Sequence, residues 1–189
     1  MSNKVTFGLK NVHYSVATPN EDDSWDFGTP KKLNGAQELS AEVIAGKTDV
    51  YADDKIIATL ASSSGSNITL KLTELDDDFK VDVLGFAKDS NGNLVEVINH
   101  RTKTFALGYE IQGDAKSRRI WYFLCTASPI SDNTKTKAES IEPNEVSIDI
   151  TARSIEVGNY SVIRTIAKYG DTNYSSFFTQ VPELPVIGV

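Results

Sequence analysis

Residue types that carry much catalytic and metal-binding chemistry are scarce in this sequence. Its 189 residues include one cysteine, Cys125, and two histidines, His13 and His100. A lone cysteine forms no internal disulfide, and neither histidine lies in metal-ligand spacing with Cys125 or with the other histidine. We therefore predict no metal and no cofactor, and we expect a fold that its hydrophobic core stabilises.

Long apolar runs and an excess of positive charge are also missing. No stretch approaches the roughly 20 apolar residues of a membrane-spanning helix, and residues 1–5 lack the apolar stretch of a signal peptide. We expect synthesis in a cytoplasm and no membrane contact. The formal net charge is −7. Because proteins bind DNA largely by neutralising its phosphates with Lys and Arg, we predict that any contact with DNA is repulsive or neutral.

The dominant pattern in the sequence is an alternation of apolar and polar residues. The length suits a single domain over residues 1–189, and period-two alternation is typical of strands with one buried face. The phase slips at Lys10-Asn11, which predicts a β-bulge. Residues 120–125 are apolar on both faces and predict a central strand. The alternating runs cover residues 5–9, 12–16, 39–45, 68–72, 105–111 and 146–150.

These runs predict a mainly β fold in which a sandwich or barrel is built from antiparallel strands. The turn at Ser90-Asn91-Gly92-Asn93 separates two short apolar segments, so a hairpin is expected there. Hairpins pair strands that follow one another in the sequence. Antiparallel pairing is therefore the prediction for most of the sheet.

One segment has the period of a helix instead. Its apolar residues are spaced three or four apart, Thr73 suits an N-cap, and the acidic residues 76–78 suit the positive end of a helix dipole. Gly85 suits the left-handed residue that ends many helices. We predict one flanking α-helix over about residues 73–84. It should pack on the sheet through Leu75, Phe79 and Val83.

Three segments are predicted to be loops or arms from their composition. Residues 19–32 combine acidic residues with Trp25, residues 46–66 end in a serine-rich stretch, and residues 181–189 form an apolar tail with two prolines. An apolar tail is poorly placed in water. We expect this tail to dock on its own domain or on a neighbouring subunit.

Motifs for nucleotide and calcium sites are incomplete. Gly46-Lys47-Thr48 ends like a phosphate-binding loop, but Ala41 stands where the first glycine of that motif belongs. The segment from Asp89 to Asn93 fits a hairpin turn better than a calcium loop, because its glycine comes too early. Neither segment predicts a ligand site.

Signals for catalysis are equally weak. Cys125 lies in the most apolar run, where burial makes a thiol inert. Acidic clusters occur at residues 21–23, 53–54 and 76–78, and solvated loops or a helix N-terminus account for all three. We predict that the protein is not an enzyme. A hydrolase that uses carboxylates such as Asp53 and Asp54 stays open as an alternative.

Several stretches in order resemble the phi13-type family of major tail proteins from long-tailed (siphovirus) phages. The opening stretch, residues 7–14, reads Phe-Gly-Leu-Lys-Asn-Val-His-Tyr, and residues 119–124 read Arg-Ile-Trp-Tyr-Phe-Leu ahead of Ala127-Ser128-Pro129. The similarity covers most of residues 5 to 153. Further matching stretches are residues 51–54, 72–86, 105–110 and 136–144.

This resemblance implies a phage tail tube fold, which is a β-sandwich or half-barrel with one flanking helix. It implies a structural virion protein that stacks as hexameric rings around a channel through which DNA passes during ejection. Expected partners are copies of the same chain, the tape measure protein, the tail terminator and the baseplate or distal tail protein. DNA would pass through the lumen without sequence-specific binding.

The residues we expect at contacts between subunits or rings come from the predicted loops and arms. An alternative function is a carbohydrate-binding β-sandwich of a phage or cell-surface protein, in which exposed aromatic rings would stack on sugars. Its candidate rings are Trp25, Tyr160, Tyr169 and Tyr174. The expected contact residues are Trp25, Tyr51, Asp53, Asp54, Val181, Pro182 and Val186.

Overall fold

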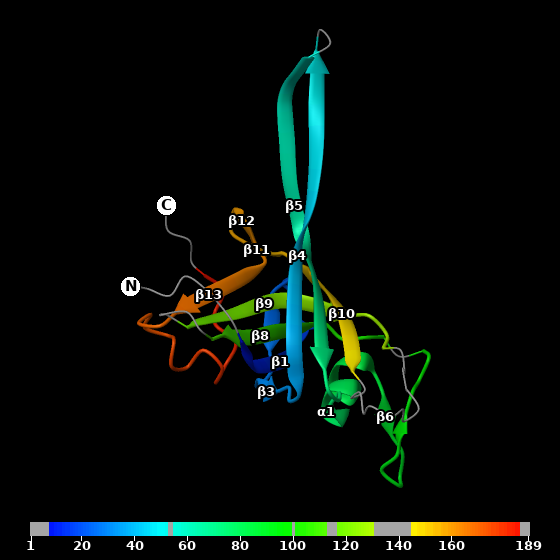
Figure 1. The fold of residues 1–189 in the computed structure, drawn as a ribbon. Coiled ribbons are helices and arrows are strands. Elements are labelled where there is room, and N and C mark those ends of the chain that lie inside the picture. The colour runs from blue at the N-terminus through cyan, green and yellow to red at the C-terminus, as the bar shows by residue number, and fades with distance from the viewer. Residues whose placement is uncertain (1–7, 53–54, 100, 113–116, 131–144, 186–189) are drawn as a thin grey trace, which may run out of the picture.

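The computed structural model describes residues 8–52, 55–99, 101–112, 117–130 and 145–185, and the chain is mainly β, as predicted (Figure 1). Two helical segments follow one another, α1 (Asp77–Phe79) and a π-helical turn (Lys80–Leu84). The strands are β1 (Leu9–Pro19), β2 (Trp25–Phe27), β3 (Lys31–Lys32), β4 (Ala36–Ala52), β5 (Lys55–Leu72), β6 (Ala87–Lys88), β7 (Leu94–Val95), β8 (Phe105–Ile111), β9 (Arg118–Ala127), β10 (Val146–Arg153), β11 (Ile155–Val157), β12 (Tyr160–Val162) and β13 (Arg164–Lys168).

Nine of these strands form one antiparallel sheet. Its order is β2-β1-β8-β9-β10-β5-β4, with β3 paired to β1 and β13 paired to β9. Strands β1 and β4, near opposite ends of this order, contact each other. The amide of Leu33, between β3 and β4, donates to the Val12 carbonyl oxygen at 2.8 Å. The sheet therefore curls into a half-barrel.

Strands β10 and β13 follow one another along the same edge of β9. Arg153 at the end of β10 pairs with Leu124, and Arg164 at the start of β13 pairs with Tyr122. Between them, the amide of Phe123 donates to the Ile163 carbonyl oxygen at 3.2 Å. Because the pairing with β9 continues without a gap, β11 and β12 form an excursion that leaves the sheet edge and returns to it.

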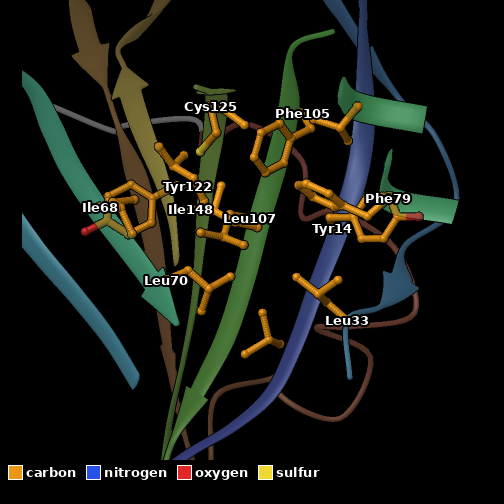
Figure 2. Packing of buried hydrophobic residues seen from close by; sticks show 14 of the residues in the cluster. Tyr14, Leu33, Ile68, Leu70, Phe79, Phe105, Leu107, Tyr122, Cys125 and Ile148 are labelled. Carbon is orange, nitrogen blue, oxygen red and sulfur yellow. The ribbon is translucent and has the colours of Figure 1, made fainter. Parts of the chain in front are cut away.

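The core has two clusters, one on each face of the central strands. In the first cluster, Phe79 meets Tyr14 edge-on at 5.0 Å between ring centroids and Phe105 at 5.5 Å (Figure 2). The second cluster lies on the other face and includes Trp121 and Phe123. Residues 120–125 of β9 are all buried, which confirms the predicted central strand. Burying one such large apolar side chain contributes about 1.5–3 kcal/mol to folding.

The predicted helix packs as expected but begins later. Leu75, Phe79 and Val83 are 3%, 0% and 0% exposed, and Gly85 ends the helical segment in a left-handed conformation with φ of 83°. However, the segment begins at Asp77 rather than at Thr73. The Thr73 amide donates to the Gly35 carbonyl oxygen at 2.9 Å. Sheet pairing therefore extends to residue 73, and the helical backbone starts only after Asp76, whose ψ of 136° is not helical.

The prediction of a loop over residues 46–66 is wrong. Residues 46–52 of β4 pair with residues 55–62 of β5, and residues 65–72 of β5 pair with β10 as well as with β4. The small residues allow close approach of strands and do not indicate a loop. A Cβ on Gly65 would collide with the Ala152 carbonyl oxygen, and one on Gly46 would come within 2.8 Å of the Ser62 hydroxyl.

Two further predictions concern the start of the chain. The register of β1 against β8 shifts between Lys10 and His13, and Asn11 has a positive φ of 51°, so the predicted bulge is confirmed. The loop predicted over residues 19–32 contains the short strands β2 and β3, which pair with β1.

The predicted hairpin at residues 90–93 is confirmed by the pairing of β6 with β7. Within the described residues, no helix has the length and apolarity needed to span a membrane.

Candidate functional site

The most prominent feature of the molecule is a two-stranded arm that extends beyond the body of the sheet (Figure 1). Strand β5 stops pairing with β10 at Gly65, whereas its pairing with β4 continues from Ser63 to the tip at Lys55. We call residues 45–63 the arm. Eight residues of β4, 45–52, span about 25 Å at about 3.3 Å per residue. The arm is therefore a pair of extended strands and not a short turn at the end of the sheet.

Both outer edges of the arm lack a strand partner in the described part of the chain. Strand β4 pairs only with β5, and β5 has no second neighbour beyond Gly65. Isolated two-stranded hairpins are marginally stable in water. Unpaired edge groups are also a template for pairing with another chain. The arm is thus a structure that a neighbouring chain would complete.

The open edge continues from the arm into the body along β4. Residues 36–46 of β4 are exposed or half-buried, and none of them is fully buried. Val43 is 60% exposed, although it is a β-branched apolar residue. Strand β4 therefore depends on its ladder with β5 more than on packing, and no second strand pairs with it in the described part of the chain.

The predicted contact residues fall in separate places. Tyr51 lies near the arm tip, where it pairs with Ile56. Trp25 in β2 is half-buried beside the second cluster, with the Arg153 guanidinium 5.2 Å from its ring centroid. Val181 is buried in the second cluster, and Pro182 is half-buried beside it. The roles of these residues at an interface stay predictions. Asp53, Asp54 and Val186 lie outside the described residues.

The apolar tail docks, in its described part, on its own domain. We call residues 171–184 the strap, since they cross the sheet face that carries the second cluster. The Trp121 indole N–H donates to the Phe177 carbonyl oxygen at 2.6 Å, and Phe177 is 2% exposed. The ring of Phe178 stacks on His13 at 4.7 Å with an interplanar angle of 10°. Val181 extends the same apolar contact.

A partly buried ion pair supports the strap from beneath. The Arg119 guanidinium lies 4.1 Å from the ring centroid of Tyr174 and donates to the Tyr174 carbonyl oxygen. Its Nε also donates to the Glu110 carboxylate at 3.2 Å, and Asn11 donates to the same carboxylate oxygen at 2.9 Å. Sequence reasoning missed this network. Its signal was the aromatic residues at 174, 177 and 178, which are spaced three and four apart, although the segment forms turns and not a helix.

The titratable groups of the core do not form a reactive site. Burial raises the pKa of the Cys125 thiol well above its ordinary value, so the thiolate needed for nucleophilic attack is not formed. Burial also lowers the pKa of His13, whose Nδ1 lies 2.8 Å from the Asn11 carbonyl oxygen. Within the described residues, no group of three or more His, Cys, Asp or Glu side chains could hold a metal.

A cavity of about 480 Å³ lies between β3 and the start of α1. Tyr14 lines it and donates from its hydroxyl to Asp82 Oδ2 at 3.0 Å. Lys31 lines it too and pairs with the same oxygen at 2.6 Å. Asp77 and Asp78 pair with nearby lysines at 3.2 and 3.8 Å. These carboxylates take part in ion pairs, and the cavity lining includes no histidine or cysteine.

The candidate sugar-stacking rings differ in their surroundings. Trp25 and Tyr174 each lie under a guanidinium group, of Arg153 and Arg119 respectively. Tyr169 is 67% exposed and packs edge-on against Tyr174 at 5.5 Å. Two of the four rings therefore already stack on cations of the same chain.

Comparison with protein-family models and with curated proteins finds no match for this chain.

Proposed function

We propose that this protein is a structural subunit that polymerises with copies of itself into a hollow tube, the tail tube of a long-tailed phage. The observation that carries the proposal is the arm, whose two edges lack a partner in the described chain. A chain that worked as a monomer would leave these backbone groups open to unwanted association. An assembling subunit uses them as contacts.

The curvature and the open edges of the sheet support a ring. The half-barrel ends in β4 on one side and in the short strands β2 and β3 beside β1 on the other. When a subunit joins the next one side by side, each open edge gains a neighbour, and closed symmetry leaves no free edge. A closed ring of such subunits would enclose a central space.

The charge of the chain suits a channel for DNA. The formal net charge is −7, and binding to DNA depends mainly on cationic contacts that release counterions. A tube built from subunits with an excess of negative charge would let DNA slide without holding it. In this proposal the protein is part of the virion, and its partners are other copies and the remaining tail components.

Electron microscopy of the purified protein at rising concentration tests the proposal. The matched variant replaces residues 47–61 by Asn-Gly, which joins Gly46 to Ser62, a pair in the observed register. We expect the full chain to form rings or hollow tubes. The variant should keep the unfolding behaviour of the body and remain monomeric.

Two outcomes would contradict the proposal. One is that the variant with the shortened arm forms the same tubes as the full chain. The other is that the full chain stays monomeric at its solubility limit and binds immobilised glycans, which would favour a carbohydrate-binding module instead.

A further inference from the structure

Two Asn-Gly pairs occur in the sequence, Asn34-Gly35 and Asn91-Gly92. Glycine after asparagine matters chemically, because it has no Cβ that would keep its backbone nitrogen away from the preceding side chain. All four residues are exposed. The two pairs therefore present the same chemistry to water, and they differ in how firmly the surrounding structure holds their backbone.

We propose that Asn91 is a site of spontaneous deamidation, whereas the fold protects Asn34. The backbone nitrogen of Gly92 attacks Asn91 Cγ and gives up its proton, through solvent, to the side-chain nitrogen, which leaves as ammonia. The product is a five-membered succinimide ring. Water then opens one of the two ring carbonyls and leaves aspartate or isoaspartate at position 91. One water is consumed and one ammonia is released, with no oxidation or reduction.

The backbone around Asn91 belongs to a small, separate hairpin at the end of the body away from the arm (Figure 1). Strands β6 and β7 pair at two positions and form their own two-stranded sheet. None of residues 87–99 is buried, so opening this hairpin exposes no core. Two-stranded hairpins are marginally stable by themselves. Local opening therefore costs little free energy.

The hairpin must open before the reaction, because the attacking nitrogen is hydrogen-bonded in the closed turn. The Gly92 amide donates to the Asp89 carbonyl oxygen at 3.1 Å. The Asp89 carboxylate accepts from the amides of Asn91 and Asn93, each at 2.8 Å. All of these bonds lie within residues 89–93. A Cβ on Gly92 would meet nothing within 4 Å, so the open turn leaves the nitrogen free to rotate toward Cγ.

The backbone around Asn34 is tied to the main sheet instead. The preceding residue, Leu33, is 2% exposed. The Gly35 carbonyl oxygen accepts from the Thr73 amide at 2.9 Å, and a Cβ on Gly35 would collide with the Thr73 hydroxyl. The Asn34 amide donates to Asp76 Oδ2 at 3.2 Å. Freeing this segment breaks contacts of the main sheet and exposes core, so its opening costs more free energy.

Deamidation changes the hairpin in two ways. Either product adds a negative charge close to Asp89. Isoaspartate also runs the main chain through Cγ, which lengthens the backbone by one carbon. The Asp89 carboxylate then no longer fits the amides of residues 91 and 93 together. The surface of the hairpin thus changes with the age of the protein, while the body of the sheet stays the same.

Peptide mapping by mass spectrometry tests the proposal on the purified full chain, incubated at mildly alkaline pH. We expect conversion at Asn91 to be at least about tenfold faster than at Asn34, because the two segments differ in opening free energy. Backbone fragmentation should identify isoaspartate among the products at position 91. In urea, which unfolds both segments, the two rates should converge.

A matched pair of variants tests the role of the turn. Asp89→Ala removes the carboxylate that closes the turn, so it should raise the rate at Asn91 and leave the rate at Asn34 unchanged. Asp22→Ala is the control, because Asp22 accepts from the Ser24 amide in another exposed turn. It should change neither rate, and thermal unfolding checks that both variants fold.

Four results would each overturn the proposal. The first is equal rates at Asn91 and Asn34 in the folded chain, and the second is a difference in rate that persists in urea. The third is conversion of Asn91 to aspartate without isoaspartate, because this product pattern does not pass through the succinimide ring. The fourth is a rate at Asn91 that Asp89→Ala does not change.

Discussion

The indole nitrogen of Trp121 and the backbone carbonyl of Phe177 form a buried hydrogen bond across 56 positions of the sequence. Trp121 comes from the central strand β9, and Phe177 comes from the strap, which lies outside the sheet. The bond fixes where an irregular segment sits on a regular sheet. It also satisfies two polar groups that would otherwise be buried alone.

Replacing Trp121 by Phe should destabilise the protein by about 1–3 kcal/mol beyond the loss of apolar contact, because the Phe177 carbonyl is left without its donor. The free energy of unfolding from urea denaturation measures this effect. Trp25→Phe is the control, since Trp25 is half-buried and its indole donates no hydrogen bond to any residue that the structure describes. Equal losses in the two variants would contradict the role of the hydrogen bond.

Gly108 is predicted to be intolerant of a side chain for a related reason. A Cβ at this position would lie 2.7 Å from the Trp121 ring. Gly108→Ala should therefore cost about 1–3 kcal/mol through overpacking. In Gly28→Ala the nearest atom to the new Cβ is 3.6 Å away, so its effect should stay within about 0.5 kcal/mol. Thermal or urea unfolding of both variants measures these changes in the free energy of unfolding.

Alternation in the sequence was sufficient to predict much of the sheet. The bulge at Lys10-Asn11, the fully buried residues 120–125 and the β6–β7 hairpin all follow from local patterns. The buried helix face at Phe79 and Val83 follows from spacing alone. These features depend on residues that are close to one another in the sequence, so the sequence alone is enough to predict them.

The arm, the strap and the start of the helix depend on distant partners instead. Gly65 looked like a loop residue, but it allows β10 to approach β5. The bond between Thr73 and Gly35 extends sheet pairing into the predicted first helical turn. The strap has apolar residues spaced three and four apart, but its position on the sheet depends on contacts with the distant residues Arg119 and Trp121.

The pH dependence of stability should include a contribution from His13. Burial is the main cause of its lowered pKa, and the charges of Lys32 and Arg119 act in the same direction. Since the unfolded chain binds the proton more readily, the stabilising contribution is complete above about pH 6.5. It is lost as the pH falls from there through the folded-state pKa.

Substituting His13 by Phe tests this contribution, because Phe keeps a ring against Phe178 and does not titrate. Between neutral pH and about pH 5, the unfolding midpoint of the unchanged chain should fall more steeply than that of His13→Phe. His100 is present in both proteins, so its titration cancels in the comparison. Parallel curves for the two proteins would show that His13 does not contribute.

Hydrogen exchange should distinguish the arm from the rest of the sheet before and after assembly. In β9, each half of the strand has neighbours on both sides, whereas in the arm each strand has one neighbour. Local opening of the arm in the monomer breaks fewer contacts, so the amides of residues 45–52 should exchange faster than those of residues 118–127. Assembly should slow exchange in the arm and leave β9 unchanged. Mass spectrometry of monomeric and assembled samples measures exchange in both segments at once. If the arm of the monomer is already as protected from exchange as β9, the arm does not depend on a neighbouring chain and the prediction is wrong.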